Sequence, residues 1–243
     1  MTPIGDLPRI FDRMRTLGLK VMLATNNATM TVEQYLEKLA GFGVTLEAGQ
    51  VITSAHGTAS ALTKAFPDKG AVYVVGEAGV LAALCDAGFK TITDPDDDTP
   101  VAAVVVGMDR ALTYEKLRRA MWHIRAGAQF YGTNPDLTFP TPAGLVPGAG
   151  SMIAAVRAVA GVDPTIIGKP SPFMFTLAAE RMQLEMQAIL AVGDRLETDI
   201  AGGQAVGART ALVLSGVSTE EQAGRWAPQP DLIVKDLATL LSV

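Results

Sequence analysis

The sequence of 243 residues lacks several features that would place it in a particular class of protein. Its single cysteine, Cys85, excludes an internal disulfide framework and a thiolate metal cluster, and we expect it to be a buried structural thiol in a reducing compartment. No apolar run approaches the roughly 18 residues of a membrane span, and the N-terminus has neither the basic start nor the apolar core of a signal peptide. These absences predict a cytoplasmic protein.

Basic residues are also in short supply. The chain carries 20 Lys and Arg against 25 Asp and Glu, which gives a net charge of -5, and it has no block of Lys or Arg. Because binding to a polyanion depends on clustered basic groups that release counterions, we expect neither a nucleic-acid partner nor an anionic membrane surface. A small ligand is the expected partner.

What the sequence does contain is an alternation of short apolar strands and helical patterns, with 49% hydrophobic residues in all. This alternation is typical of α/β proteins with parallel strands. Strands are predicted at 19–25, 50–55, 189–194, 209–215 and 231–234. A first helix is predicted between Asp6, as its N-cap with Pro8 in the first turn, and Gly18, which ends it.

The middle of the chain holds a second set of alternating elements. Strands are predicted at 71–76, 90–93, 102–108 and 128–133, with helices at 78–87 and 113–127. The acidic run at 94–100 is interpreted as a solvated surface loop. The sequence therefore predicts a second α/β module inserted into the first.

Three polar clusters follow predicted strands, where open α/β sheets bind their ligands. In the first, "ATNNAT" at 24–29, the Thr25 hydroxyl and nearby helix N-terminal amides suit a phosphate. The alternative is that Thr25 and Asn26 only cap the next helix. In the second, "IIGKPSPFMF" at 166–175, Lys169 lies at a strand end between Gly and Pro, which fixes the direction of its ammonium group.

The third cluster is "AVGDRLETDI", in which Asp194 ends a strand and Asp199 lies five residues further on. Both carboxylates can face one crevice, and such hard oxygen ligands suit Mg²⁺, which commonly takes one or two protein carboxylates beside a substrate phosphate. The alternative is a pair of acids that stabilises a helix N-terminus through its dipole.

Together these clusters resemble the haloacid dehalogenase (HAD) superfamily of phosphohydrolases. Thr25 is similar to its second motif, Lys169 to its third and "GDRLETD" to its acidic fourth. The segments "TNNAT", "TNPDLTFPT", "GLVPGAGSMIAAV" and "GKPSP" resemble the branch of p-nitrophenyl phosphatases, phosphoglycolate phosphatases and NagD-like enzymes. That resemblance implies a Rossmann-like core at 1–57 and 165–243 and an α/β cap of the C2 type at 58–164.

The resemblance also implies roles for individual residues. Thr25 and Lys169 would hold the phosphoryl oxygens and Asp194 would ligate Mg²⁺, while Asp199 would orient the metal shell or Lys169. The same pocket would be lined by further substrate-binding side chains, which are Asn26, Asn27 and, from the cap segment 133–141, Asn134. Lys169, Thr25 and Asp194 are therefore the predicted catalytic residues, and Asp194 and Asp199 the predicted metal ligands.

One family motif has no counterpart in the 243 residues. The superfamily's first motif is an apolar strand ending in Asp-x-Asp-Gly, whose first Asp attacks phosphorus and whose second acts as general acid and base. The helix at "PIGDLPRIFDRMRTLG" resembles the one that follows this motif, so we expect the chain to begin after it. Asp94 and Asp96 have the spacing but lie in the acidic run of the cap, and they are poor substitutes. His56 and His123 are interpreted as packed or surface histidines.

The missing strand would lie in the middle of the core sheet, between the strands that end at Thr25 and Asp194. Its absence would leave two backbone edges exposed, which favours a homo-oligomer. The flanking strands could pair directly, a segment of another subunit could enter, or the gene product could start upstream of Met1.

Two functions are compatible with this pattern. The first is a Mg²⁺-dependent phosphoester hydrolase that acts on a small phosphorylated substrate without the usual aspartyl nucleophile. A metal-activated water would then attack directly, and phosphodiesters or activated esters would be preferred substrates. The second is a catalytically inactive protein that binds a phosphorylated ligand or serves as a scaffold. An N-terminally truncated phosphatase is a further alternative.

Overall fold

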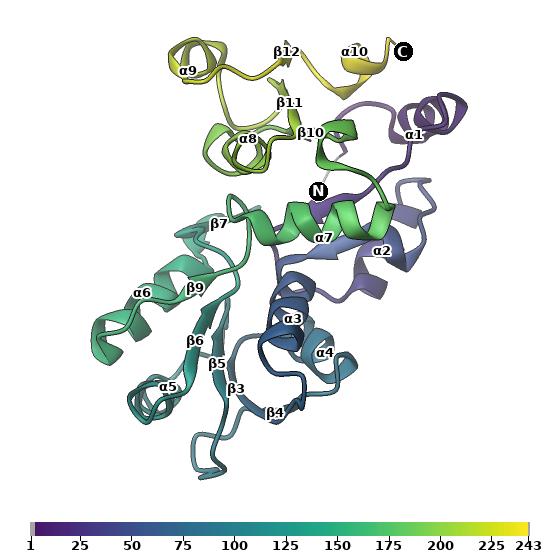
Figure 1. The fold of residues 1–243 in the computed structure, drawn as a ribbon. Coiled ribbons are helices and arrows are strands. Elements are labelled where there is room, and N and C mark those ends of the chain that lie inside the picture. Colours follow the sequence, from purple (N-terminus) through teal and green to yellow (C-terminus); the bar gives the residue numbers. More distant parts are fainter. Residues whose placement is uncertain (1–2, 243) are drawn as a thin grey trace. The chain divides into compact units, whose positions relative to one another are not determined.

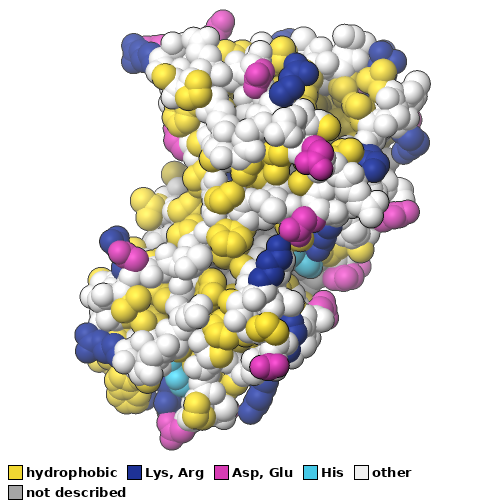
Figure 2. Space-filling model, in the orientation of Figure 1, with side chains coloured by type: hydrophobic (Ala, Val, Ile, Leu, Met, Phe, Trp, Pro, Cys, Tyr) yellow, Lys and Arg dark blue, Asp and Glu magenta, His cyan; other side chains and the backbone are white. Residues whose placement is uncertain are grey.

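A computed structural model describes residues 3–242, which fall into two compact units. The first unit comprises Met1–Leu23, Tyr35–Val51 and Lys169–Val243, and the second comprises Ala24–Gln34 and Ile52–Gly168. Among the described residues, no helix has both the length and the hydropathy to cross a membrane. On the face drawn in Figure 2, basic and acidic side chains are interspersed rather than gathered by sign.

The second unit is built on a five-stranded parallel sheet in the order β4-β3-β5-β6-β9. Its strands are β3 (Ala71–Val75), β4 (Lys90–Ile92), β5 (Ala103–Val106), β6 (Gln129–Gly132) and β9 (Thr165–Ile166). Its helices are α3 (Ser54–Ala65), α4 (Ala78–Asp86), α5 (Tyr114–Arg125) and α6 (Ala149–Ala160). A hairpin of β7 (Thr138–Thr141) and β8 (Gly144–Pro147), which the sequence analysis did not predict, precedes α6.

Helices cover both faces of this sheet because the strands are apolar on both sides (Figure 1). In β3, Val74 belongs to the buried cluster of α3 and α4, whereas its neighbour Tyr73 belongs to the cluster of α5 and α6. Successive residues of a strand point to opposite faces, so one apolar strand supplies both layers. The inserted α/β module predicted from the sequence is thus a three-layer sandwich.

The first unit contains a parallel sheet in the order β10-β11-β12, with Gly193 at the end of β10 in register with Leu212. The strands are β10 (Leu190–Gly193), β11 (Arg209–Val213) and β12 (Leu232–Val234). Its further helices are α1 (Leu7–Thr16), α7 (Pro172–Met182), α8 (Ala201–Ala205), α9 (Glu220–Arg225) and α10 (Leu237–Leu241), with 3₁₀ turns at Ala48–Gln50 and Met186–Ala188 and a π-helical turn at Leu196–Ile200.

At the boundary of the two units, β1 (Leu23–Thr25) pairs with β2 (Val51–Thr53), and α2 (Val32–Ala40) runs from the second unit into the first. All the strands and helices predicted at definite ranges are present, most of them shortened by a few residues at their ends. The α/β class is confirmed. The side chain of Asp6 accepts a hydrogen bond from the backbone N–H of Arg9, and Gly18 has a φ of 68°, so the predicted start and end of the first helix are also confirmed.

The prediction for Cys85 is wrong, because its side chain is exposed. The buried face of α4 is formed by Val80, Ala83 and Leu84, which follow one another at helical spacing. Cys85 falls just outside this face, where its Sγ lies 3.4 Å from Oγ1 of Thr91.

The compact units also differ from the predicted division at 58 and 165. Residues 24–34 and 52–57 group with the inserted module instead of with residues 1–23. The physical reason is a set of hydrogen bonds that tie Asn26 to Ser54, Asn134 and Asp136. The core and cap boundaries stay a prediction.

The strand that we expected to be missing from the core sheet would lie beside β10. Within residues 3–242, β10 pairs only with β11, so one edge of this strand has no hydrogen-bonded neighbour there. Leu190 and Val192 of β10 are 38% and 39% exposed, which is unusual for a strand of a parallel sheet. The three expected ways of completing this edge stay predictions.

Candidate functional site

The first part of the candidate site lies where β10 ends. After Gly193 the chain leaves the strand at Asp194 and enters the π-helical turn Leu196–Ile200, which contains Asp199. Gly193 has no side chain, and the carboxylate of Asp199 occupies the space: a Cβ on Gly193 would overlap Cβ and Cγ of Asp199. The glycine therefore lets the acid fold back over the strand end.

Asp199 forms an ion pair with Lys169, the predicted catalytic lysine. Nζ of Lys169 donates to Oδ1 of Asp199 at 2.6 Å, and the two side chains are only 14% and 11% exposed. The other carboxylate oxygen, Oδ2, accepts a hydrogen bond of 3.2 Å from the backbone N–H of Arg195. Since both oxygens of Asp199 are engaged, its position fits the predicted role of orienting Lys169.

Asp194 is held from the loop that follows β11. Its Oδ2 accepts from the backbone N–H of Val217 at 2.9 Å, and its backbone carbonyl accepts from the N–H of Ser218 at 2.9 Å. A Cβ on Gly216 would overlap Oδ2 of Asp194, so this glycine also makes room for an acid. The Ser218 hydroxyl in turn accepts from the N–H of Leu196 at 3.1 Å.

These donors test whether the site suits the predicted Mg²⁺. Oδ1 of Asp194 accepts no hydrogen bond from the described residues, and the residue is partly exposed, which leaves this oxygen as a candidate ligand for a cation. Within the same residues there is no group of three or more His, Cys, Asp or Glu side chains that could hold a metal. One carboxylate with water and substrate oxygens fits Mg²⁺, which keeps much of its hydration shell.

Thr25, Asn26 and Asn27 form a turn in the second unit. The N–H of Asn27 donates to Oγ1 of Thr25 at 3.2 Å, and Oδ1 of Asn27 accepts from both the N–H and the hydroxyl of Thr29, at 2.9 and 2.8 Å. Thr31 and Gln34 exchange the reciprocal hydrogen bonds of a capping box at the start of α2. The alternative that Thr25 and Asn26 cap this helix is therefore wrong.

Asn134 lies against this turn. Its Nδ2 donates to the backbone carbonyl of Asn26 at 2.7 Å, and the same carbonyl accepts from Oγ of Ser54 at 2.6 Å. Nδ2 of Asn26 donates to Oδ2 of Asp136 at 3.2 Å. Three segments that are distant in the sequence thus meet at one residue of the turn.

The remaining candidate residues lie elsewhere. In the acidic run, the N–H of Asp96 donates to Oδ1 of Asp94 at 2.9 Å, a local turn that fits the interpretation as a loop. Nδ1 of His56 lies 2.9 Å from Oγ1 of Thr53. His123 is buried with its ring centroid 5.2 Å from that of Tyr73, and burial lowers the pKa of this imidazole. His123 is therefore a packed histidine.

The predicted site residues thus fall into two sets, each within one unit. Lys169, Asp194 and Asp199 come together in the first unit, and the second contains Thr25, Asn26, Asn27 and Asn134. The residues that support them were not singled out from the sequence, apart from the glycine before Lys169. They are Ser54, Asp136, Gly193, Gly216 and Ser218. The glycines beside "GD" and after "LVLS" carried the only signal, since a glycine at a strand end often marks a close approach of another group.

A parallel α/β fold that places a lysine–aspartate pair and a second acid at the end of a strand suits an anionic ligand, because open α/β sheets bind ligands at the carboxyl ends of their strands. A family model described as haloacid dehalogenase-like hydrolase matches residues 1–90, and one described as HAD-hydrolase-like matches residues 166–240. An acid sugar phosphatase of Staphylococcus aureus is 37% identical over 234 residues, which are 96% of this chain and 88% of that protein.

Solved structures agree. A p-nitrophenyl phosphatase from Archaeoglobus fulgidus matches 99% of this chain and 92% of its own, with a TM-score of 0.90 and 30% identity. NagD from E. coli K-12 matches 98% of this chain and 91% of its own, with a TM-score of 0.89 and 30% identity. The chain therefore belongs to the haloacid dehalogenase-like hydrolases, in the subfamily of NagD and the p-nitrophenyl phosphatases, and is a phosphatase of that superfamily.

Proposed function

We propose that this phosphatase is a Mg²⁺-dependent hydrolase of small phosphate esters, with sugar phosphates as its substrate class. The observation that carries the proposal is the buried pair of Lys169 and Asp199 at the end of β10, beside an Asp194 whose Oδ1 is a candidate ligand for a cation. The substrate class is supported by the acid sugar phosphatase of S. aureus, to which the chain is 37% identical.

Each side chain has a task that its chemistry suits. The Lys169 ammonium binds a phosphoryl oxygen, and Asp199 holds the ammonium in one direction through its 2.6 Å hydrogen bond. The Thr25 hydroxyl and the polar groups of Asn26 and Asn27 hold the remaining phosphoryl oxygens. Asp194 provides the carboxylate for Mg²⁺, which when bound polarises the phosphoryl group and lowers the pKa of a coordinated water.

The finer part of the proposal concerns the nucleophile. We propose that water, and not Asp194 or Asp199, attacks phosphorus, since Asp194 would hold the metal and Asp199 is paired with Lys169. The oxygen of the attacking water becomes part of the phosphate product, and the ester oxygen leaves with a proton as the alcohol. Because no covalent capture is needed, activated esters and phosphodiesters become suitable substrates alongside monoesters.

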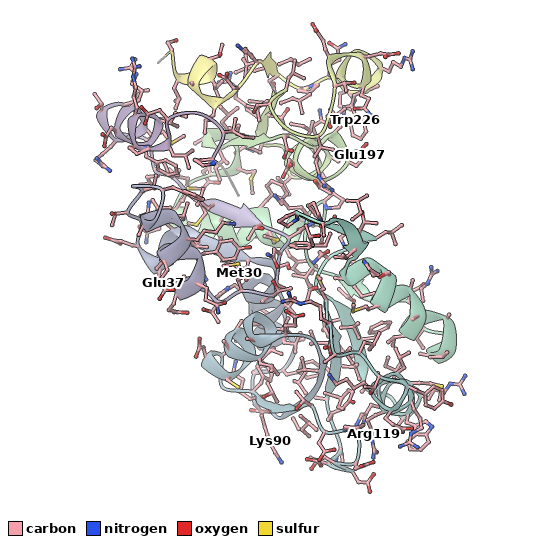
Figure 3. All side chains as sticks on the ribbon, turned by 180° about the vertical axis from the view of Figure 1, so that it is seen from behind. Met30, Glu37, Lys90, Arg119, Glu197 and Trp226 are labelled. Carbon is pink, nitrogen blue, oxygen red and sulfur yellow. The ribbon has the colours of Figure 1, made fainter. Side chains whose placement is uncertain are left out.

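The experiment is the steady-state hydrolysis of p-nitrophenyl phosphate, bis-p-nitrophenyl phosphate and a panel of sugar phosphates, with Mg²⁺ and with EDTA. Asp194→Asn should lower kcat about a hundredfold or more, because the carboxylate for the metal is lost. Glu197→Gln is the matched control: it removes one negative charge from the same turn, where Glu197 is exposed (Figure 3), and should leave kcat within about twofold.

Each alternative gives a different result. Phosphate binding by calorimetry without turnover of any ester would contradict the hydrolase and favour a protein that binds a phosphorylated ligand. Turnover that appears only after an Asp-x-Asp-Gly strand is added ahead of Met1 would favour a shortened phosphatase. Hydrolysis of monoesters alone would contradict direct attack by water, and activity that is equal in EDTA would refute the metal dependence.

A further inference from the structure

The polar groups around Asn26 form a network of hydrogen bonds within the second unit. We call it the Asn26 cluster, and its members are Asn26, Ser54, Thr133, Asn134 and Asp136. Ser54 is fully buried and Asn134 is 5% exposed, so their polar groups depend on partners within the protein.

The donors of Asn134 are fully used within this cluster. Its Nδ2 group has two hydrogens and donates to the Asn26 carbonyl at 2.7 Å and to Oγ1 of Thr133 at 3.3 Å. Its Oδ1 accepts from the backbone N–H of Asp136 at 3.1 Å. An amide with both hydrogens donated to the protein has none left for a phosphoryl oxygen.

The cluster acts on the turn that carries the Thr25 hydroxyl. The backbone carbonyl of Asn26 accepts hydrogen bonds from Asn134 and Ser54, and the Asn26 side chain donates one to Asp136. Asn26 is therefore held through both its backbone and its side-chain amide. Thr25 is the preceding residue, and its Oγ1 accepts from the N–H of Asn27 on the far side of Asn26. Fixing Asn26 therefore fixes the direction of the hydroxyl.

The same cluster meets the residue that precedes Lys169. The N–H of Gly168 donates to the carbonyl of Thr133 at 2.8 Å. A Cβ on Gly168 would lie 2.7 Å from Oδ1 of Asn26 and 2.7 Å from Cβ of Asn134, so only glycine fits there without displacement. The lysine-bearing segment thus starts from a backbone position that packs against the cluster.

We propose that Asn134 is a positioning residue, and that with Ser54 and Asp136 it holds the Thr25–Asn27 turn in the conformation that receives a phosphoryl group. This replaces the direct contact with substrate that the sequence analysis expected of Asn134. The proposal rests on the proposed function for its kinetic consequence, whereas the ordering of the turn can be measured without turnover.

The first measurement is backbone amide exchange by mass spectrometry on the full chain. Asn134→Asp keeps the side-chain shape and the acceptor for the N–H of Asp136, but it places a carboxylate oxygen against the Asn26 carbonyl. Exchange in residues 24–31 should become about tenfold faster, since each 1.4 kcal/mol of lost local stability gives a tenfold change. Exchange in β5 (Ala103–Val106) should stay the same, which shows that the sheet is intact.

The second measurement separates a hydrogen bond from a charge. Asp136→Asn keeps an oxygen that can accept from Nδ2 of Asn26 and should retain slow exchange in residues 24–31, whereas Asp136→Ala should lose it. Asp68→Asn and Asp68→Ala are the controls, because Asp68 is an exposed carboxylate of the same unit with no hydrogen bond among the described residues. The two Asp136 variants also test the positioning role if Asn134→Asp does not fold.

Kinetics on p-nitrophenyl phosphate then test the consequence for catalysis. A misplaced hydroxyl should lower kcat of Asn134→Asp between about tenfold and a hundredfold, with KM changed less than about threefold. A rise in KM with unchanged exchange in residues 24–31 would mean that Asn134 contacts substrate, and would overturn the proposal. If wild type hydrolyses no ester, the proposed function fails, and unchanged exchange in both variants would still refute the positioning role independently.

Discussion

Replacing Gly193 by alanine tests whether the absence of a side chain at this position is what allows Asp199 to pack over the strand end. The new methyl group would overlap Cβ and Cγ of Asp199 and lie 2.5 Å from its Oδ2. Asp199 is buried and its partner Lys169 is only 14% exposed, so the acid can move away only by breaking a buried ion pair. The substitution therefore combines overpacking with loss of a charged hydrogen bond.

Both contributions have known sizes. Overpacking of a buried site costs about 1–3 kcal/mol, and a hydrogen bond to a charged group contributes about 1.5–3 kcal/mol. A shift of Asp199 that relieves the steric overlap would break its hydrogen bond with Lys169, so the two costs cannot both be avoided. We therefore expect the free energy of unfolding of the first unit to fall by about 2–5 kcal/mol. With a urea dependence of about 1–3 kcal/mol per molar, the midpoint should fall by about 1 M or more.

Tryptophan fluorescence can report this unit alone. The chain has 2 tryptophans, and Trp226 packs against the buried cluster of Leu196, Ile200, Leu212 and Ala223, whereas Trp122 is on α5 of the second unit. In a Trp122→Phe background, urea titrations followed at Trp226 therefore measure the unit that contains Gly193.

Gly224→Ala is the matched control, because a Cβ there meets nothing within 4 Å and the residue lies in α9. Its free energy of unfolding should be unchanged or higher by up to about 1 kcal/mol, which is the gain in helix propensity, and its urea midpoint should not fall. Gly193→Ala should also cost less in an Asp199→Ala background, where Cγ and Oδ2 are absent. Equal midpoints for the two glycine variants would refute the steric argument.

Three further predictions concern other residues. Gly216→Ala, whose methyl would overlap Oδ2 of Asp194, should weaken Mg²⁺ binding about tenfold by calorimetry, and an unchanged affinity would exclude Asp194 as ligand. Burial lowers the pKa of His123 below its ordinary value of 6.5, so the unfolded state binds more protons than the folded state just below that pH. Urea midpoints measured by circular dichroism should therefore fall between pH 7 and pH 5. His123→Gln should make this fall in the midpoint smaller. Cys85 should react with Ellman's reagent in the native protein, and Cys85→Ser should change stability by less than about 0.5 kcal/mol; labelling only in urea would contradict its exposure.

Local signals in the sequence located most of the strands of this fold and several of its helices, but not the hairpin of β7 and β8. Apolar runs located the strands, and the caps at Asp6 and Gly18 located the first helix, because periodicity and capping depend on residues within a few positions of one another. The motifs that contain Thr25, Lys169 and Asp194 also marked the candidate site and the family, since these side chains follow strand ends where ligands bind.

The tertiary structure decided which side chains from distant segments form hydrogen bonds with each other. Lys169 and Asp199 are 30 positions apart, and only the family resemblance led us to expect their pairing. Asn26 and Asn134 are 108 positions apart, and no local pattern predicts the hydrogen bond between them. The same holds for Gly193, whose value lies in the space it leaves for another side chain. The general tendency of free cysteines to be buried gave the wrong prediction for Cys85, because its exposure depends on which face of α4 packs against the sheet. Such contacts come from packing between distant segments, which a residue's sequence neighbours do not encode.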